Sequence, residues 1–406
     1  MTRSRVPALA ALLLVAAAWA WGAYALWHST ELPSLDLAHL DPHDYFSDSF
    51  LDRSAAYERF LTILSLLATI AVVAVLAVYA RHGERLARES AAGRVGTGLL
   101  LAMLGFAIVW LTQVPFDLAS LWWQRRYDVS HQGYVRHLLD GFLSLGSEFV
   151  FLCLSFAVMM GFAGIFRRWW WLAAAPVFVV IALAFAFLTP YLVPNTSAIE
   201  NPQLLAEARA LERIEDVPEA RLQVQEVHEF TAAPNAEAAG LGPSRSVILW
   251  DTLLRDFEPS EVRLVLAHEV GHLAHDDPLK GVGWMAVYLL PALGLIALLT
   301  RRRGGLARPE AVPLAILLLV VAQLVAMPLL NSATRRQEAA ADWAALEATH
   351  DPASDRKLMQ KLARKSLSDP DPPNWVYGMF ENHPTIMQRI ALADAWEQQQ
   401  RDRARR

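Results

Sequence analysis

Two histidines and a glutamate form the pattern in this sequence that most clearly indicates chemistry. His268 and His272 are four residues apart, and Glu269 directly follows the first of them. On an α-helix this spacing places both imidazoles on one face, about 40° apart, so they could bind one metal ion. In such an HExxH pattern two neutral imidazoles bind Zn²⁺, and the glutamate acts as general base on a water at the metal. The sequence therefore predicts a hydrolytic zinc site.

The surrounding residues indicate a buried helix rather than a chance match of five letters. Pro259, Ser260 and Glu261 are typical of a helix start. Apolar side chains then supply the back of the helix, at Leu264, Val265, Leu266, Val270 and Leu273. We expect this apolar face to be buried and to hold both imidazoles in place.

A third ligand must lie elsewhere, because catalytic zinc usually has three protein ligands and one open position. His275 is seven residues after His268, but a single straight helix cannot easily place three side chains around one tetrahedral ion. The position ten residues after His268 is Pro278, which excludes a histidine there. Glu338, with Asp342 one helical turn later, is the better candidate. We therefore expect His275 to support a ligand, although a ligand role for it stays open.

Asp342 could hydrogen-bond a ligand imidazole and so fix its tautomer, which is a common arrangement around zinc. Without the two histidines, Glu338 and Asp342 would be interpreted as the solvated face of an alanine-rich helix. The HExxH pattern favours the metal interpretation.

Several further segments are similar to one known family. They are Asn235 and Ala236, SVILWDTLL at 246–254, HEVGHLAHDD at 268–277, TRRQEAAAD at 334–342 and ENHPTIMQRI at 381–390. Together they resemble the type I CAAX prenyl endopeptidases, integral-membrane zinc metallopeptidases related to bacterial heat-shock membrane proteases. The chain departs from the family's SRxxExxAD segment at Thr334, which replaces a serine. With lower specificity, the resemblance covers nearly the whole chain.

The resemblance implies one Zn²⁺ per chain, with His268, His272 and Glu338 as its ligands. It also implies that Glu269 is the catalytic base and that Asp342 supports a ligand. These roles agree with the interpretation of the residues alone.

Two more pairs of residues receive roles from the resemblance. His383 and Arg389 would contact the substrate or the transition state, and a structural tie between the C-terminal segment and the zinc helix is the alternative. Asn235 and Ala236 would lie at a strand edge, which can bind an extended peptide through backbone hydrogen bonds. An ordinary turn is the alternative for that pair.

Composition predicts a membrane protein. Of the 406 residues 54% are hydrophobic, and the mean hydropathy is +0.27, yet 19% are charged, so the charge must be segregated. A helix needs about 20 apolar residues to cross a bilayer. Seven such runs lie at 8–27, 57–80, 97–117, 141–164, 170–192, 281–300 and 312–330. We predict a mainly α membrane protein of about seven transmembrane helices enclosing a chamber, with a small α+β, gluzincin-like zinc peptidase domain.

Three features of these apolar runs, namely the first run itself, Glu148 and Cys153, lead to further predictions. The first run could be a cleaved signal peptide, but its length through Trp27 favours a retained helix. Glu148, in the fourth run, should face a water-filled cavity or hydrogen-bond to Ser144. Cys153 is the single cysteine, so an intrachain disulfide is excluded. The net charge of −5 gives no reason to expect nucleic acid.

The chain divides into two predicted parts. Residues 1–194 form a membrane region with five transmembrane helices, and residues 195–406 form the zinc metallopeptidase domain with two further transmembrane helices. Between about 195 and 278 a soluble insert contains an amphipathic helix near 201–216 and strands near 221–230 and 246–250. The histidines precede two spans and Glu338 follows them, so two crossings return the chain to the same side.

The side of the membrane is ambiguous. Positive charge gathers at Arg3, Arg5, Arg81, Arg85, Arg88, Arg94, Arg167, Arg168 and Arg301–Arg303. The positive-inside rule makes these segments cytoplasmic and puts the zinc domain outside. The resemblance implies the reverse, and Arg125, Arg126 and Arg136 weaken the charge argument. We leave open which side of the membrane carries the zinc domain, with a slight preference for the cytosol. The membrane itself is expected to be the plasma membrane of a bacterium.

We expect a metalloendopeptidase similar to the CAAX prenyl proteases. Its substrate would be a peptide or protein, which could be lipidated or membrane-inserted. One alternative is a quality-control protease that degrades misfolded membrane proteins. A second is a transporter or receptor with a vestigial zinc site. Glu269 argues against the second, because a structural zinc site is closed by a fourth ligand and needs no base.

Overall fold

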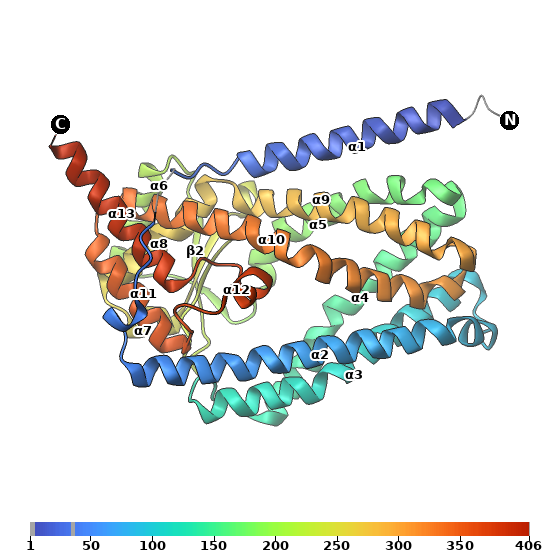
Figure 1. Cartoon of the computed structure of the whole chain (residues 1–406), viewed down its shortest axis with the longest axis horizontal. Coiled ribbons are helices and arrows are strands. Elements are labelled where there is room, and N and C mark those ends of the chain that lie inside the picture. Colours follow the sequence, from blue (N-terminus) through green and yellow to red (C-terminus); the bar gives the residue numbers. More distant parts are fainter. Residues whose placement is uncertain (1–4, 34–36, 406) are drawn as a thin grey trace.

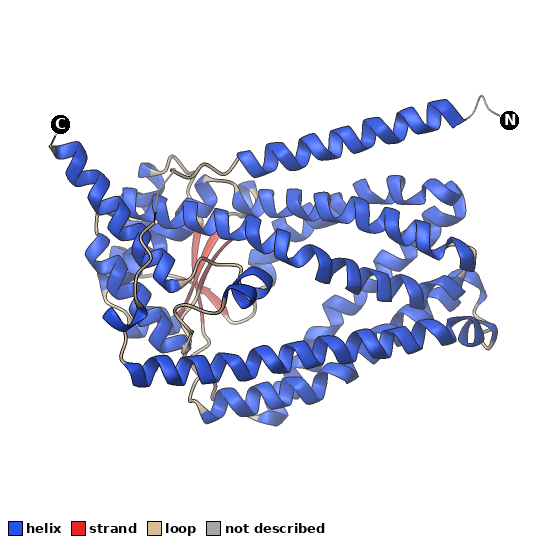
Figure 2. Ribbon diagram, viewed as in Figure 1, coloured by secondary structure: helices blue, strands red, loops and turns tan. Residues whose placement is uncertain are grey.

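The structure, a computed structural model, describes residues 5–33 and 37–405. Its helices are α1 (Arg5–His28), α2 (Asp48–Arg88), α3 (Gly93–Arg126), α4 (Tyr134–Phe166), α5 (Trp170–Leu192), α6 (Pro202–Ile214), α7 (Asp251–Asp256), α8 (Pro259–Ala274), α9 (Asp277–Leu299), α10 (Val312–Thr349), α11 (Pro352–Ser366), α12 (Asn374–Phe380) and α13 (Ile386–Ala404). Its strands are β1 (Thr196–Ala198), β2 (Arg221–Gln225), β3 (Ala236–Ala239) and β4 (Ser246–Trp250). Long helices run along the molecule, and the strands lie among shorter helices near one end (Figures 1 and 2).

Each of the seven predicted apolar runs lies in its own helix. Within the described residues, six helical stretches are long and apolar enough to span a membrane: Ala10–His28, Asp48–Arg88, Gly93–Arg126, Phe149–Leu192, Asp277–Arg303 and Pro309–Thr349. The fourth of these joins the end of α4 to α5 across the short 3-10 turn η2 (Arg167–Trp169). The prediction of a mainly α membrane protein with about seven spans is confirmed.

A cavity of about 510 Å³ lies among three of the spans, α2, α3 and α10, and the chamber expected inside all of the spans stays a prediction. The walls of the cavity are mostly apolar, as at Val72 and Leu324, with Asp117 and Gln113 as polar exceptions. Arg3 and the side chains of Arg5, Ser144 and Glu148 lie outside the described residues. The division of the chain near residue 195 stays a prediction.

The four strands form one sheet in the order β1-β2-β4-β3. β2 and β4 are parallel, and β3 is an antiparallel edge strand in which Ala236 lies opposite Leu249. β2 is shorter than the predicted strand, because the backbone N–H groups of Val227 and His228 bind the Asp251 carboxylate instead of continuing the ladder. Gly240 ends β3 with a φ of +89°, where a Cβ would lie 2.2 Å from the Ser244 carbonyl oxygen.

The helix that carries the two histidines starts where the sequence predicts. α8 begins at Pro259, and the Glu261 carboxylate accepts a hydrogen bond of 2.9 Å from the Glu258 backbone N–H. This capping box satisfies an N–H group that the helix itself leaves unpaired. The apolar back of α8, including Leu264 and Leu266, is buried in a core shared with the sheet.

Close packing of α8 on α10 brings Glu338 and Asp342, which lie on α10, next to the two histidines of α8. A Cβ added at Gly271 of α8 would lie 3.2 Å from the Ala344 Cβ and 3.5 Å from the Ala341 Cα of α10. The alanine-rich face of α10 is therefore a buried helix contact rather than a solvated surface. α10 extends from the membrane spans into the domain that holds the sheet (Figure 1).

Candidate metal centre

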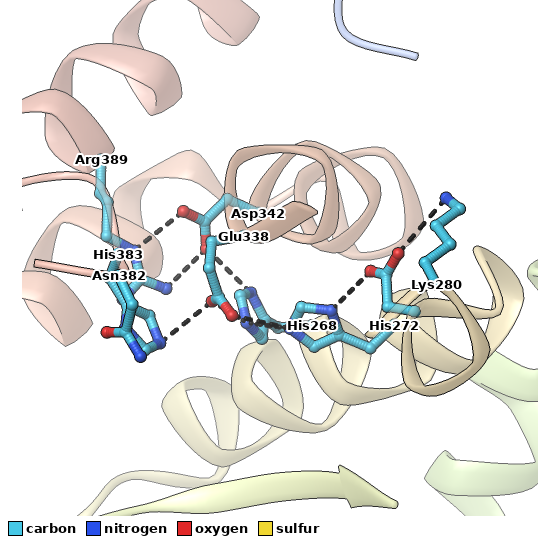
Figure 3. Close-up of polar contacts among 9 residues, drawn as sticks. His268, His272, Lys280, Glu338, Asp342, Asn382, His383 and Arg389 are labelled. Atoms are coloured by element: carbon cyan, nitrogen blue, oxygen red, sulfur yellow. Dashed lines mark hydrogen bonds and ion pairs between the residues drawn. The ribbon is translucent and has the colours of Figure 1, made fainter. Parts of the chain in front are cut away.

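His268, His272 and Glu338 bring three possible ligand atoms together. The two Nε2 atoms are 3.1 Å apart, and Glu338 lies 3.3 Å from His268 through Oε2 and 3.6 Å from His272 through Oε1. A tetrahedral zinc ion separates its nitrogen ligands by about 3.3 Å, given Zn–N bonds of about 2.0–2.1 Å. The three side chains are only 11–13% exposed. Among the described residues, this group could hold one metal ion (Figure 3).

An unsatisfied atom supports the fit to a cation. Glu338 Oε2 is buried and accepts no hydrogen bond within the described residues, although imidazole nitrogens of His268 and His383 lie 3.3 and 3.1 Å away. A buried carboxylate oxygen normally has a partner. A metal ion at this point would supply it.

Each imidazole also faces a carboxylate through its other ring nitrogen. His268 Nδ1 is 2.8 Å from Asp342 Oδ1, and His272 Nδ1 is 2.8 Å from Asp277 Oδ2. The hydrogen bond to Asp277 holds the proton on Nδ1 of His272 and leaves its Nε2 lone pair for a metal, and the Asp342 ion pair lies at the same ring atom of His268. The sequence argument identified Asp342 and missed Asp277. Its only signal was its place in HEVGHLAHDD, just past the turn where α8 ends and α9 begins.

Carboxylates dominate the electrostatics around the two imidazoles. Burial by itself would lower the pKa of His268, but Asp342 and Glu338 raise it to about 9. Burial likewise opposes charging of His272, yet Asp277 and Glu338 raise its pKa well above the usual value. Surroundings that stabilise an imidazolium also stabilise a bound divalent cation.

Arg389 reaches the site through Asp342. Its Nε and Nη2 donate hydrogen bonds of 2.8 and 2.6 Å to the two oxygens of that carboxylate (Figure 3). Burial disfavours the charged guanidinium, but the neighbouring Asp342 raises the pKa of Arg389 above its usual range. Both of these N–H groups of Arg389 therefore bind Asp342, the residue that contacts His268. This geometry favours the structural alternative for Arg389, and its predicted contact with substrate stays untested.

His383 lies at the open side of the group. Its side chain is 49% exposed, its Nε2 is 3.1 Å from Glu338 Oε2, and its Nδ1 is 2.7 Å from Asn382 Oδ1. It comes from the segment between α12 and α13, on the far side of Glu338 from the two histidines of α8 (Figure 3). A partly exposed donor at this point can reach a molecule bound beside the metal.

His275 is not part of the candidate ligand group. It caps the C-terminal end of α8, and burial lowers its pKa. Within the described residues, Asp277 rather than His275 makes the ion pair with His272. The supporting role that we predicted for His275 therefore remains untested.

Glu269 and the edge strand share the space around the group. A cavity of about 340 Å³ is bounded by Glu269, His272, Glu338 and His383, and by Asn235 with strand β3, which begins at Ala236. A smaller one, of about 100 Å³, joins Asn235 and Ala236 to His268, Glu269 and Arg389. The glutamate after the first histidine and the predicted peptide-binding edge thus face common cavities.

Comparisons with known proteins agree with this geometry. A model of peptidase family M48 matches residues 198–397, which include all three candidate ligands. The metalloprotease YhfN of Bacillus subtilis is 27% identical over 71% of each chain, and protease HtpX homolog 1 of Streptomyces coelicolor is 32% identical over 53% of this chain and 81% of its own. The crystal structure of S. mikatae Ste24p superposes with a TM-score of 0.74 at 19% identity, covering 93% of this chain and 96% of that one.

Proposed function

Because the chain belongs to peptidase family M48 and is an integral membrane metallopeptidase, we propose that it is a zinc endopeptidase that cleaves peptide bonds next to the membrane. The observation that carries the proposal is the convergence of His268, His272 and Glu338 beside a cavity that Glu269 also lines. Two histidines and one carboxylate, with a remaining side open, match the donor set of catalytic zinc.

Zinc bound there would supply a Lewis acid for the scissile carbonyl and would lower the pKa of a water to about 7. Side chains of the protein would carry out the proton transfer and stabilise the oxyanion. Glu269 would take a proton from the attacking water and pass it to the leaving amine. His383 would donate to the developing oxyanion, a contribution typically worth about 3–4 kcal/mol.

Supporting residues would keep the ligands in the reactive arrangement. Asp342 and Asp277 hold the Nδ1 sides of His268 and His272, and Arg389 fixes Asp342 by two hydrogen bonds. We assign these three residues to positioning rather than to bond breaking.

Strand β3 would bind the substrate backbone. Because Asn235 C=O accepts from Trp250 N–H in β4, the alternation of an antiparallel ladder turns the polar groups of Ala236 and Ala238 toward the open edge. An extended peptide can pair with them as an additional strand. Its scissile bond would then lie between β3 and the metal group.

The test uses the full chain, loaded with zinc in detergent. Wild type and Glu269→Gln are incubated with a prenylated CAAX peptide and, separately, with an unfolded membrane protein. We propose CAAX-like processing, so wild type should cleave the peptide, and Glu269→Gln should keep its zinc and lose cleavage. Cleavage of the unfolded protein alone would assign quality control instead. Full turnover by Glu269→Gln would refute its role as base.

A further inference from the structure

A second polar cavity lies at the end of the helix bundle opposite the metal centre. It has a volume of about 570 Å³ and opens between the α4–α5 turn and the α9–α10 turn. Arg167 and Arg168 of η2 and Arg301 of the 3-10 turn η4 (Thr300–Arg303) line it. Figure 1 shows these turns at the right, with the N-terminal end of α1. The family match does not account for three arginines around one cavity.

The charge of these three arginines is not balanced locally. Within the described residues, none of them forms an ion pair with a carboxylate, whereas Arg85 and Arg88 on the nearby end of α2 pair with glutamates. Arg168 instead lies over the Trp169 ring, 5.0 Å from its centroid. Like charges gathered at one cavity repel each other, and an anion between them removes that repulsion.

The backbone around the cavity is fixed in an uncommon shape. Arg167 has a φ of 50°, which side-chain-bearing residues seldom adopt. In the opposite turn, Gly304 and Gly305 have φ values of 86° and 71°, and a Cβ added at Gly305 would meet nothing within 4 Å. Arg303 Nη1 donates a hydrogen bond of 2.6 Å to the Ala80 carbonyl of α2, which fastens this turn to the bundle. The two turns on either side of the cavity thus depend on positive-φ residues, and one of them is bonded to α2.

The remaining lining is mostly apolar and almost fully buried, with Trp170 2% and Leu306 0% exposed, and helix ends such as these are expected at the level of lipid headgroups. Trp170, Ala297 and Leu306 contribute to the wall, and α4, α5 and α9 all end or begin there. Tryptophan is enriched at this level of a bilayer. An arginine guanidinium binds phosphate oxygens through two parallel N–H donors. Exposed arginines around a cavity at the ends of membrane-spanning helices suit the phosphate of a lipid whose chains lie in the bilayer.

We propose that this cavity binds the phosphate headgroup of an anionic membrane lipid. The guanidinium groups of Arg167, Arg168 and Arg301, which are exposed, contact the phosphate, and the acyl chains extend into the surrounding bilayer. Basic pockets between transmembrane helices bind anionic headgroups in this manner. The site is separate from the metal centre, so the proposal does not depend on peptidase activity.

Binding is measured on the delipidated full chain in detergent, by native mass spectrometry and by the midpoint of thermal unfolding. Phosphatidylglycerol, phosphatidylcholine, diacylglycerol and inorganic phosphate are added in parallel. We expect one phosphatidylglycerol to be retained per chain, with a rise in the unfolding midpoint of several degrees. Phosphatidylcholine should bind at least tenfold more weakly, and diacylglycerol should have no effect. Stabilisation by inorganic phosphate at equal concentration would overturn the lipid assignment in favour of a soluble phosphate ligand.

Variants locate the site. Arg168→Gln with Arg301→Gln should lower phosphatidylglycerol affinity at least tenfold, and Arg301→Lys, which keeps the charge and the fold, should lower it by a smaller factor. The matched control is Arg85→Gln with Arg88→Gln, which removes two arginines already paired with glutamates at the same end. Equal loss in the variants and the control would reduce the effect to general surface charge and overturn the proposal.

Discussion

Asp277 and Asp342 each lie 2.8 Å from Nδ1 of a different imidazole, Asp277 in a hydrogen bond and Asp342 in an ion pair, and they come from different helices. Asp277 begins α9, directly after the helix of the histidines, and Asp342 belongs to α10, about 70 residues away in the chain. Residue types and spacing alone predicted His268, His272, Glu269 and Glu338, and the structure brings His268, His272 and Glu338 together. Residue types and spacing could not select Asp277, because its contact with His272 depends on the turn between α8 and α9. The sequence also could not predict that Arg389 binds Asp342, because this contact depends on where α13 packs against α10.

Loss of Asp277 should weaken the metal site without removing a ligand. Asp277→Asn cannot stabilise the Nδ1 proton of His272 as a carboxylate does, and such changes typically cost about 10–100-fold in metal affinity. Competition with a chelator of known affinity measures the change. Asp276→Asn is the matched control, because Asp276 is its more exposed neighbour and pairs with Arg245 rather than with a ligand. Equal affinity in Asp277→Asn and wild type would remove Asp277 from the site.

A buried carboxylate near the site should make stability depend on pH. Burial, together with the nearby Asp342, raises the pKa of Asp355 to about 7, well above its value of 3.8 in the unfolded chain. The folded state therefore holds this proton more tightly, so its contribution to stability is complete below about pH 4 and is lost as pH rises through about 7. Asp355→Asn keeps a neutral side chain at every pH.

The measurement is thermal unfolding of both proteins between pH 5 and pH 8. The difference between wild type and Asp355→Asn should shift in favour of the variant as pH rises. A difference that stays constant over this range would show that Asp355 does not titrate there.

At the scale of elements, the sequence predicted the helices better than the strands. The long apolar runs and the amphipathic pattern of α6 are strong signals, and the helices lie where expected. β1 has three residues and β3 reads AEAA, so neither has large apolar side chains in alternation. The edge at Asn235 and Ala236 was expected from family resemblance, not from periodicity. Antiparallel pairing with β4, which follows after residues 240–245, determines that this short segment is a strand.

The open edge of β3 gives a prediction of its own. Ala238→Pro removes an N–H group that faces away from β4, so the sheet should remain folded while substrate binding loses a hydrogen bond. One such bond is worth about 1 kcal/mol, and we expect kcat/KM to fall roughly five- to tenfold. Steady-state kinetics with a peptide substrate, together with thermal unfolding, measures both effects.

Glu237→Pro is the contrasting variant, because the N–H of Glu237 faces β4 and belongs to the ladder. It should lower the unfolding temperature, unlike Ala238→Pro. If Ala238→Pro left kcat/KM unchanged, the substrate would not pair with this edge.

At the scale of the whole molecule, several arginine clusters gather at the end of the helices opposite the metal centre, whereas Arg125, Arg126 and Arg136 lie at the end that holds the sheet. The α2–α3, α4–α5 and α9–α10 turns and the helix ends beside them lie at one end with the start of α1 (Figure 1), and they carry Arg81, Arg85, Arg88, Arg94, Arg167, Arg168 and Arg301–Arg303. The connection between α1 and α2, at the other end, contains neither lysine nor arginine in residues 29–47. The sequence showed these clusters but not that they share one end, because this follows from how the helices pack.

This distribution predicts that the arginine-rich end is cytoplasmic and that the metal centre faces the opposite side. The prediction is the reverse of the orientation implied by family resemblance. In a Cys153→Ser background, cysteines are introduced at Glu200 near the sheet and at Ala91 in the α2–α3 turn. A membrane-impermeant maleimide added to intact bacterial cells should label the first and not the second. Labelling of Ala91→Cys alone would place the metal centre in the cytosol.

The central claim is that His268, His272 and Glu338 hold one zinc ion. It is tested most directly by metal analysis of the purified full chain and of Glu338→Ala, prepared in parallel and dialysed against the same buffer. We predict one zinc per chain in wild type and a large loss of zinc in Glu338→Ala, with the fold retained by circular dichroism. Undiminished zinc in folded Glu338→Ala would contradict the account and would return the third ligand to His275.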